Sequence, residues 1–157
     1  MSTGTTLVIE STSSNATEKL GEQLGQHLCG GEVIELVSDL GGGKTTFVRG
    51  LGRGVGSADN VASPTFTITK TYHGSKLTLQ HFDFYRLNEP GVVAAELVEY
   101  MGEPETVTAI EWSDIVKDVL PEKRLTIVFE PISGSEESRH ITFSCPSSLS
   151  YLLKGLK

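Results

Sequence analysis

The sequence lacks the features that mark exported, zinc-binding or membrane-spanning proteins. Its two cysteines, Cys29 and Cys145, form no CxxC pair and have no histidines at ligand spacing. We therefore expect neither a disulfide framework nor a zinc site. No apolar run approaches the roughly 20 residues that span a bilayer. Residues 1–15 lack the basic segment and apolar stretch of an export signal, so a cytoplasmic protein without membrane association is expected.

Basic residues are also scarce: 13 Lys and Arg stand against 20 Asp and Glu, for a formal net charge of -7. This balance disfavours unaided binding to nucleic acid, which depends on Lys and Arg neutralising phosphates. The composition, with 38% hydrophobic and 21% charged residues, is that of a globular protein. A length of 157 residues fits one domain, which we expect to span residues 1–157.

The first half of the chain alternates helix and strand patterns. Asn15 has Glu18 three residues on, which predicts a capping box at the start of a helix that ends at Gly30 and Gly31. Residues 32–37 are rich in β-branched side chains and predict a strand, and a helix is expected over about 45–51. Two alternating segments, 66–72 and 77–85, predict an antiparallel hairpin.

The second half is richer in strands. A helix is expected over 92–101, a mostly buried strand over 106–112, and two further strands over 124–130 and 139–145. The closing segment carries apolar residues at helical spacing and predicts an amphipathic helix: Leu149, Leu152, Leu153 and Leu156. The fold class that follows is an α/β sandwich around a mixed sheet.

Between the strand 32–37 and the next helix lies a phosphate-loop pattern, G-x-x-x-x-G-K-[ST], with Ser38 in the first glycine position. Lys44 is expected to neutralise the β and γ phosphates, and the Thr45 hydroxyl to bind magnesium. The backbone amides of the loop would surround the phosphates. The nucleotide-binding residues expected from the loop are Asp39, Leu40, Gly41, Gly42, Gly43, Lys44, Thr45 and Thr46. The alternative is a glycine-rich strand-to-helix turn with a solvated lysine.

Two carboxylates are candidates to complete a site. Glu111 follows a buried apolar run and is expected at a strand end, where it could hold magnesium, although a capping or surface carboxylate is the alternative. Asp83 shares a strand face with His81, because side chains alternate, and could orient an attacking water or reach the magnesium. His81 itself fits a structural histidine better than a catalytic one.

Three further features bear on the site: the base of the nucleotide, the segment 63–66 and Trp112. No Asn-Lys-x-Asp motif for guanine is present, so adenine is the better expectation. Residues 63–66, SPTF, fit either a segment that senses the γ phosphate or an ordinary proline turn. Trp112, next to Glu111, would by default pack in the core.

In order and spacing, the segments SDLGGGKTTFVRG, SPTFTI, HFDFYRL and AIEW resemble those of the TsaE (YjeE) family, small bacterial ATPases needed to form threonylcarbamoyladenosine in tRNA. The resemblance covers residues 17–143 approximately. It implies a P-loop NTPase-like three-layer α/β sandwich whose mixed sheet contains an antiparallel hairpin. It also implies docking on the TsaD–TsaB complex, with contact to tRNA only through that complex.

Carried over to this sequence, the resemblance implies ATP and Mg²⁺ as ligands. Lys44 would bind the triphosphate, Thr45 and Glu111 would hold the metal, and Asp83 would be needed for hydrolysis. Trp112 would lie near the site and influence turnover or docking. The family usually has glycine where this chain has Ser38.

Two other classes of function remain as alternatives. A small-molecule kinase usually needs an arginine-bearing lid, and residues 88–104 contain no Arg or Lys. A nucleotide-dependent binding module would bind without hydrolysis, which Asp83 and Glu111 argue against only if both face the γ phosphate.

Overall fold

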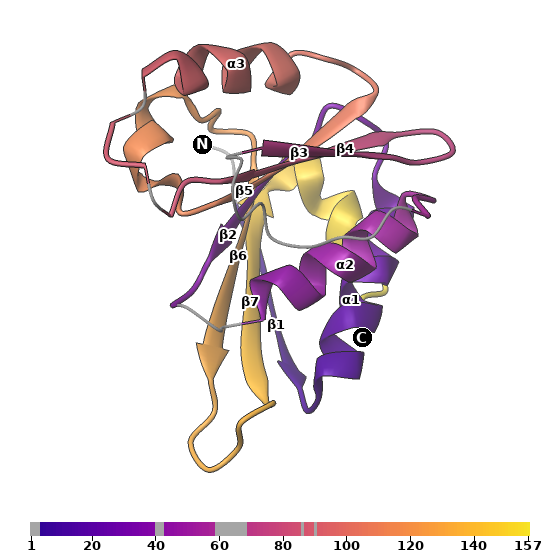
Figure 1. Cartoon of the computed structure of the whole chain (residues 1–157). Helices are drawn as coiled ribbons and strands as arrows, with labels where there is room; N and C mark the ends of the chain where they lie inside the picture. The colour runs from indigo at the N-terminus through magenta and orange to yellow at the C-terminus, as the bar shows by residue number, and fades with distance from the viewer. Residues whose placement is uncertain (1–3, 40–42, 59–68, 86, 90) are drawn as a thin grey trace.

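The computed structural model describes residues 4–39, 43–58, 69–85, 87–89 and 91–157. They form a mixed sheet accompanied by helices (Figure 1), which confirms the predicted α/β class. In chain order the elements are β1 (Gly4–Ser11), α1 (Ser14–His27), β2 (Val33–Val37), α2 (Lys44–Gly54), β3 (Thr69–His73), β4 (Thr78–Asp83), α3 (Gly91–Met101), β5 (Thr106–Glu111), the 3-10 helix η1 (Ser113–Val119), β6 (Leu125–Pro131), β7 (Arg139–Pro146) and the 3-10 helix η2 (Ser147–Leu153). In this described part of the chain, no helix has the length and apolar character needed to cross a membrane.

Within the described ranges the sheet has seven strands, in the order β1-β7-β6-β2-β5-β4-β3. Its centre is parallel, because β2 pairs with both β5 and β6, and β4 pairs with β5. Its edges are antiparallel, with β3 on β4 and with β7 between β6 and β1. Parallel strands end on the same edge of a sheet, so the residues that follow β2, β4 and β5 are brought together.

The predicted hairpin is confirmed as β3 and β4, with Thr71 opposite Gln80. Part of its predicted first strand, residues 66–68, lies outside the described residues. Strand β1, at the sheet edge, is not among the predicted elements. Its side chains alternate between exposed and half-buried positions, and its pairing partner is β7, at the other end of the chain.

Two predictions of helical detail are wrong. The N-cap of α1 is Ser13, not Asn15: Ser13 has extended backbone, and its hydroxyl accepts a hydrogen bond from the Ala16 amide at 3.0 Å. The closing segment forms the 3-10 helix η2 where an amphipathic α-helix is expected. Its leucines are nevertheless buried, because a spacing of three residues places Leu149 and Leu152 on one face of either helix type.

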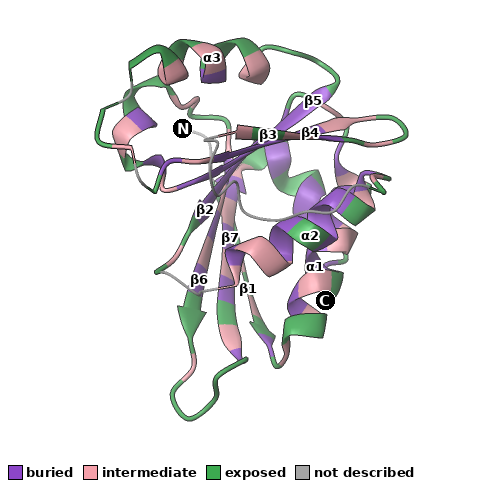
Figure 2. Cartoon of the chain, in the orientation of Figure 1, coloured by how far each residue is buried: buried purple, intermediate pink, exposed green. Residues whose placement is uncertain are grey.

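Two apolar clusters lie on the two faces of the sheet. The first joins α1, α2 and η2 to one face, with Leu24, Phe47 and Leu152 among its fully buried side chains. The second joins α3 and η1 to the other face through Leu97 and Val116. Figure 2 shows the buried residues along the strands between these layers. Each such side chain stabilises the fold by about 1.5–3 kcal/mol relative to an exposed position.

Helices α1 and α2 approach each other so closely that glycine is required at the contact. A Cβ atom on Gly50 would lie 1.8 Å from the Glu18 carbonyl oxygen, and one on Gly21 would lie 2.2 Å from that of Phe47. At the same contact, Arg53 forms an ion pair with Glu18 at 3.2 Å. This packing fixes α2, and with it the residues at its first turn.

Glu35, in the middle of β2, is a buried carboxylate with a structural set of partners. It accepts hydrogen bonds from the Ser113 hydroxyl, and from Arg124 Nε and the Thr126 hydroxyl at 3.1 Å each. Burial alone would raise the pKa of Glu35, but the hydrogen bonds from Ser113 and Arg124 outweigh it and hold the pKa below its usual value. Glu35 therefore ties β2 to β6 and to η1.

Gly50→Ala tests the helix contact. Alanine favours a helix by up to about 1 kcal/mol over glycine, yet we expect a net loss of unfolding free energy of about 1–3 kcal/mol, because the added methyl group meets backbone atoms. Chemical denaturation measures this. Gly102→Ala is the control, since its nearest contact would be 3.6 Å, and equal effects of the two substitutions would contradict the packing argument.

Glu35→Gln tests the buried carboxylate. Because the pKa of Glu35 is lowered in the folded state, its stabilisation is fully present above the ordinary value of 4.5 and is lost as the pH falls through the folded pKa. The wild-type protein should therefore exceed Glu35→Gln in stability at pH 7 and lose that advantage towards pH 3. Thermal unfolding across this range measures the difference. Glu130→Gln, an equal charge change at an exposed position, serves as control; a gap that stays constant with pH would argue against the assignment.

Candidate functional site

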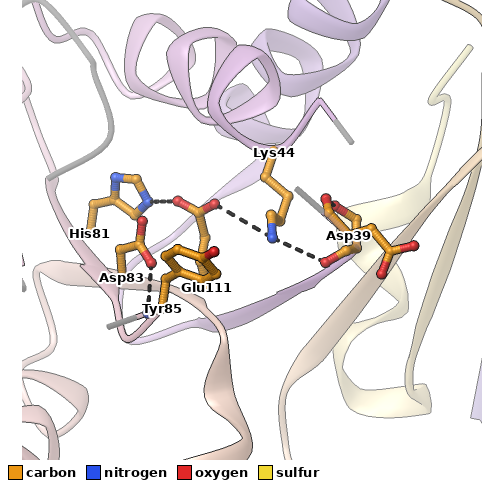
Figure 3. A network of polar contacts seen from close by, with 7 residues as sticks. Asp39, Lys44, His81, Asp83, Tyr85 and Glu111 are labelled. Carbon is orange, nitrogen blue, oxygen red and sulfur yellow. Dashed lines mark hydrogen bonds and ion pairs between the residues drawn. The ribbon is translucent and has the colours of Figure 1, made fainter. Parts of the chain in front are cut away.

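Lys44, Asp83 and Glu111, three of the residues predicted for the site, converge at the carboxyl edge of the parallel strands. Glu111 is the last residue of β5, and Asp83, the last residue of β4, lies directly opposite it in the register. Ser38 follows β2, the other neighbour of β5, and Lys44 begins α2. Figure 3 shows the side chains of Lys44, Asp83 and Glu111 together beneath α2. Segments far apart in the sequence thus form one polar cluster.

Lys44 is the centre of this cluster. Its side chain is 6% exposed, and its ammonium donates a hydrogen bond to the Ser38 carbonyl at 3.2 Å. The same nitrogen lies 4.0 Å from Glu111 Oε1 and 4.1 Å from the centroid of the Trp112 ring. Burial lowers the pKa of Lys44, and the nearby carboxylates, Glu111 first, oppose that shift. The alternative of a merely solvated lysine does not describe this side chain.

Glu111 is buried between a cation and a histidine. The residue is 2% exposed, which excludes the surface carboxylate that the sequence left open. Its Oε2 atom accepts a hydrogen bond from His81 Nε2 at 2.5 Å, while Oε1 faces Lys44. Burying a carboxylate without partners is costly in free energy, and the contacts with His81 and Lys44 offset this cost for Glu111.

Asp83 completes the pair of carboxylates. Its Oδ1 atom accepts a hydrogen bond from the Tyr85 amide at 3.0 Å, and the side chain is only half-buried. Burial raises the pKa of Asp83; the Tyr85 amide opposes this, and the Glu111 charge adds to it. Asp83 is thus a half-buried carboxylate with a raised pKa, next to the buried pair of Lys44 and Glu111.

The first turn of α2 carries the other loop residues. Gly43 is its N-cap with φ of 98°, a left-handed conformation that favours glycine. Thr45 and Thr46 follow, both half-buried. The backbone at position 38 does not require glycine, because its φ is not positive: Trp112 is the one described residue other than glycine with a positive φ. The Ser38 hydroxyl donates a hydrogen bond to the carbonyl of Asp39, an exposed residue.

Trp112 lies at the site as well as against the second core cluster. Its backbone is left-handed, with φ of 57° and ψ of 53°, a strained conformation for a bulky residue that costs about 1–3 kcal/mol. The ring contacts Tyr85, with centroids 4.9 Å apart, and covers the Lys44 ammonium. Trp112 thus packs both against the core and against the site residues Tyr85 and Lys44.

Several predicted positions lie outside the described residues: Leu40, Gly41 and Gly42 of the loop, and the segment 63–66. Conversely, the sequence indicated neither the contact of His81 with Glu111 nor the place of Tyr85 beside Trp112. The one available signal was alternation, which places His81 on the strand face of Asp83.

A groove of about 640 Å³ opens beside the cluster, between the ends of β2 and β6 and the helix η1. Its volume is in the range of small-molecule sites. However, of the described residues that line it, Glu35, Asp39, Asp114 and Glu130 are acidic and Lys117 is the one cation. Such a lining disfavours an anionic triphosphate, so the Lys44 side of the cluster is the better place for phosphates.

Magnesium fits the donors present. No group of three or more His, Cys, Asp or Glu that could hold a metal occurs in the described ranges. Magnesium needs no such group, because it is usually bound by one or two carboxylates together with phosphate oxygens and water. Glu111 offers a buried carboxylate whose second oxygen faces Lys44, the first residue of α2, and Thr45 is the next residue of that helix.

Comparison with known proteins gives a consistent result. The sequence matches the family model described as "Threonylcarbamoyl adenosine biosynthesis protein TsaE" over residues 11–141. It is 47% identical over 103 residues to the tRNA threonylcarbamoyladenosine biosynthesis protein TsaE of Synechocystis, covering 64% of this chain and 66% of that protein, just under two thirds of its length. With the protein of the same name from Nostoc it shares 36% identity over 140 residues, covering 85% and 84% of the two chains.

The fold comparison agrees with these matches. The crystal structure of YdiB from Bacillus subtilis superposes with a TM-score of 0.77 at 28% sequence identity, covering 99% of this chain and 97% of that one. The same organism's TsaE is 40% identical over 114 residues, or 73% of this chain and 70% of that protein. The chain therefore belongs to the TsaE family.

Proposed function

We propose that the chain is a magnesium-dependent ATPase that supports threonylcarbamoyl transfer to tRNA adenosine by docking on the TsaD–TsaB complex. The observation that carries this proposal is the buried Lys44 ammonium, held between the Ser38 carbonyl and Glu111 at the start of α2. A buried cation at a helix start, beside a strand-end carboxylate, suits a triphosphate and its metal. On this proposal the fold is a P-loop NTPase-like three-layer sandwich.

Each residue has a stated part in binding. Lys44 neutralises the terminal phosphates, and the backbone amides from Leu40 to Thr46 donate to their oxygens. The Thr45 hydroxyl and the Glu111 carboxylate would hold the metal, which neutralises charge on the phosphates when bound. Trp112 packs over Lys44 and would hold that ammonium in place for the phosphates.

Hydrolysis further requires an oriented water. We assign this role to Asp83, because the residue lies opposite Glu111 in the sheet and its side chain is only half-buried. General acid–base groups of this kind contribute about 10²- to 10⁴-fold to rates. Turnover of the isolated chain is slow, since an NTPase whose catalytic set is completed by a partner gains much of its rate on docking.

The partner supplies the link to tRNA. The relatives named above are tRNA threonylcarbamoyladenosine biosynthesis proteins, while this chain has a net charge of -7 and contacts tRNA only through the TsaD–TsaB complex. ATP turnover changes the state of that complex and permits a new cycle of modification in the cytoplasm. Failure of the chain with Mg-ATP to bind or stimulate TsaD–TsaB in a reconstituted modification assay would end this part of the proposal.

Lys44→Ala should weaken ATP binding roughly 10- to 100-fold, the effect of losing one charge-assisted contact of about 1.5–3 kcal/mol. Isothermal titration with Mg-ATP measures the affinity, and circular dichroism verifies the fold. Lys154→Ala, the same change at an exposed lysine in the C-terminal segment, is the control. If both variants bind like the wild type, the nucleotide site lies elsewhere.

Asp83→Asn should leave ATP binding within about threefold of wild type and reduce phosphate release roughly 100-fold or more. The amide retains an oxygen for the Tyr85 hydrogen bond, so the local backbone should persist. Malachite-green detection of phosphate, paired with titration of the nonhydrolysable analogue, separates the two effects. Wild-type protein that binds ATP without releasing phosphate, even with TsaD–TsaB, would instead favour a binding module; release only with an added acceptor would favour a kinase.

A further inference from the structure

His81 is fully buried on β4, two residues before Asp83 and on the same face of the sheet. It lies opposite Ala109 in the register, so its side chain reaches diagonally to Glu111, two residues further along β5. The 2.5 Å contact between His81 Nε2 and Glu111 Oε2 joins the ends of both strands (Figure 3).

The roles of the two atoms follow from their chemistry. An ionised carboxylate only accepts hydrogen bonds, so the Nε2 atom of His81 carries the proton and donates it. The other ring nitrogen, Nδ1, points away from Glu111 in Figure 3 and has no hydrogen-bond partner among the described residues. A buried polar atom without a partner costs about 1–3 kcal/mol. Packing alone would be served better by an apolar side chain.

The other buried glutamates show what a structural carboxylate looks like in this fold. Glu32 accepts hydrogen bonds on both oxygens, from the Cys29 amide and the Tyr151 hydroxyl on Oε2 and from the Gly30 amide on Oε1. Glu35 is likewise bonded on both oxygens, as described above. Among the described residues, Glu111 differs: His81 contacts Oε2 at 2.5 Å, while the nearest cation to Oε1, the Lys44 ammonium, lies 4.0 Å away, beyond hydrogen-bond distance.

We propose that His81 is a positioning residue for Glu111, an inference that rests on the proposed function. By holding Oε2, the imidazole fixes the carboxylate rotamer and turns Oε1 towards the start of α2, where the metal would be held. Partners that orient a metal-binding side chain typically change metal affinity or activity by about 10- to 100-fold when removed. His81 thus acts through Glu111 and does not touch the nucleotide.

The test compares two amides at position 81. The amide nitrogen of glutamine reaches about the place of Nε2, and that of asparagine only the place of Nδ1. His81→Gln should therefore retain the donor to Glu111, while His81→Asn should lose it at similar polarity. The Mn²⁺ affinity of the protein–ADP complex, measured by electron paramagnetic resonance, should fall roughly 10- to 100-fold in His81→Asn and less than about threefold in His81→Gln.

Further measurements isolate this role from a general loss of structure. ADP affinity in EDTA should match the wild type in both variants, because no metal is then held. The Mg²⁺ concentration at half-maximal ATP hydrolysis should rise in His81→Asn in parallel with the Mn²⁺ result. His140→Asn, the same substitution at an exposed histidine on β7, should change none of these values.

The outcomes separate the two proposals. Equal Mn²⁺ affinity in wild type and folded His81→Asn, or equal losses in His81→Asn and His81→Gln, would overturn the role of His81 while leaving the ATPase in place. Wild-type protein that neither binds nor hydrolyses Mg-ATP would overturn the proposed function, and this inference with it. If His81→Asn does not fold, His81→Gln still tests the role of His81. A folded His81→Gln variant with Mn²⁺ affinity like the wild type supports the positioning role, and one with weakened Mn²⁺ binding overturns it.

Discussion

The buried ion pair between Lys44 and Glu111 is the interaction on which the site depends. Removing both charges from water costs several kcal/mol each, and their attraction offsets this only with further partners. The fold supplies these: the Ser38 carbonyl and the Trp112 ring for the cation, and His81 for the carboxylate. Such a pair is a poor source of stability, which agrees with the proposed role of the cluster in binding a triphosphate and its metal.

The topology explains how so few residues create this cluster. Because β4, β5 and β2 are adjacent and parallel, their last residues meet at one edge without long side chains. The glycine contact between α1 and α2 then fixes the start of α2 above that edge. Glu35 uses the same strand β2 for a structural purpose, and its full set of hydrogen bonds distinguishes it from Glu111. Among the described residues, Glu35 thus has the hydrogen-bond partners of a structural carboxylate, while Glu111 faces the Lys44 ammonium, as the proposed role in metal binding requires.

Much of this arrangement was accessible from the sequence, and the rest depended on long-range contacts. The order of strand, glycine loop and helix placed Lys44 and Thr45, and the apolar run before Glu111 placed that carboxylate at a strand end, because both signals are local. Strand β1 was not anticipated, since its half-buried side chains gain their partners from β7. The contact between His81 and Glu111 is set by the register of β4 on β5. The position of Trp112 depends on its left-handed backbone, which the sequence does not predict because the residue is not a glycine.

A structure of the chain with Mg²⁺ and a nonhydrolysable ATP analogue tests the central claim most directly. The account predicts that the terminal phosphates lie against Lys44 at the first turn of α2. It also predicts that the metal is bound by Thr45 and by Glu111 Oε1, directly or through one water, while His81 still holds Oε2. A triphosphate bound in the acidic groove between β2 and β6, or a metal remote from Glu111, would contradict it.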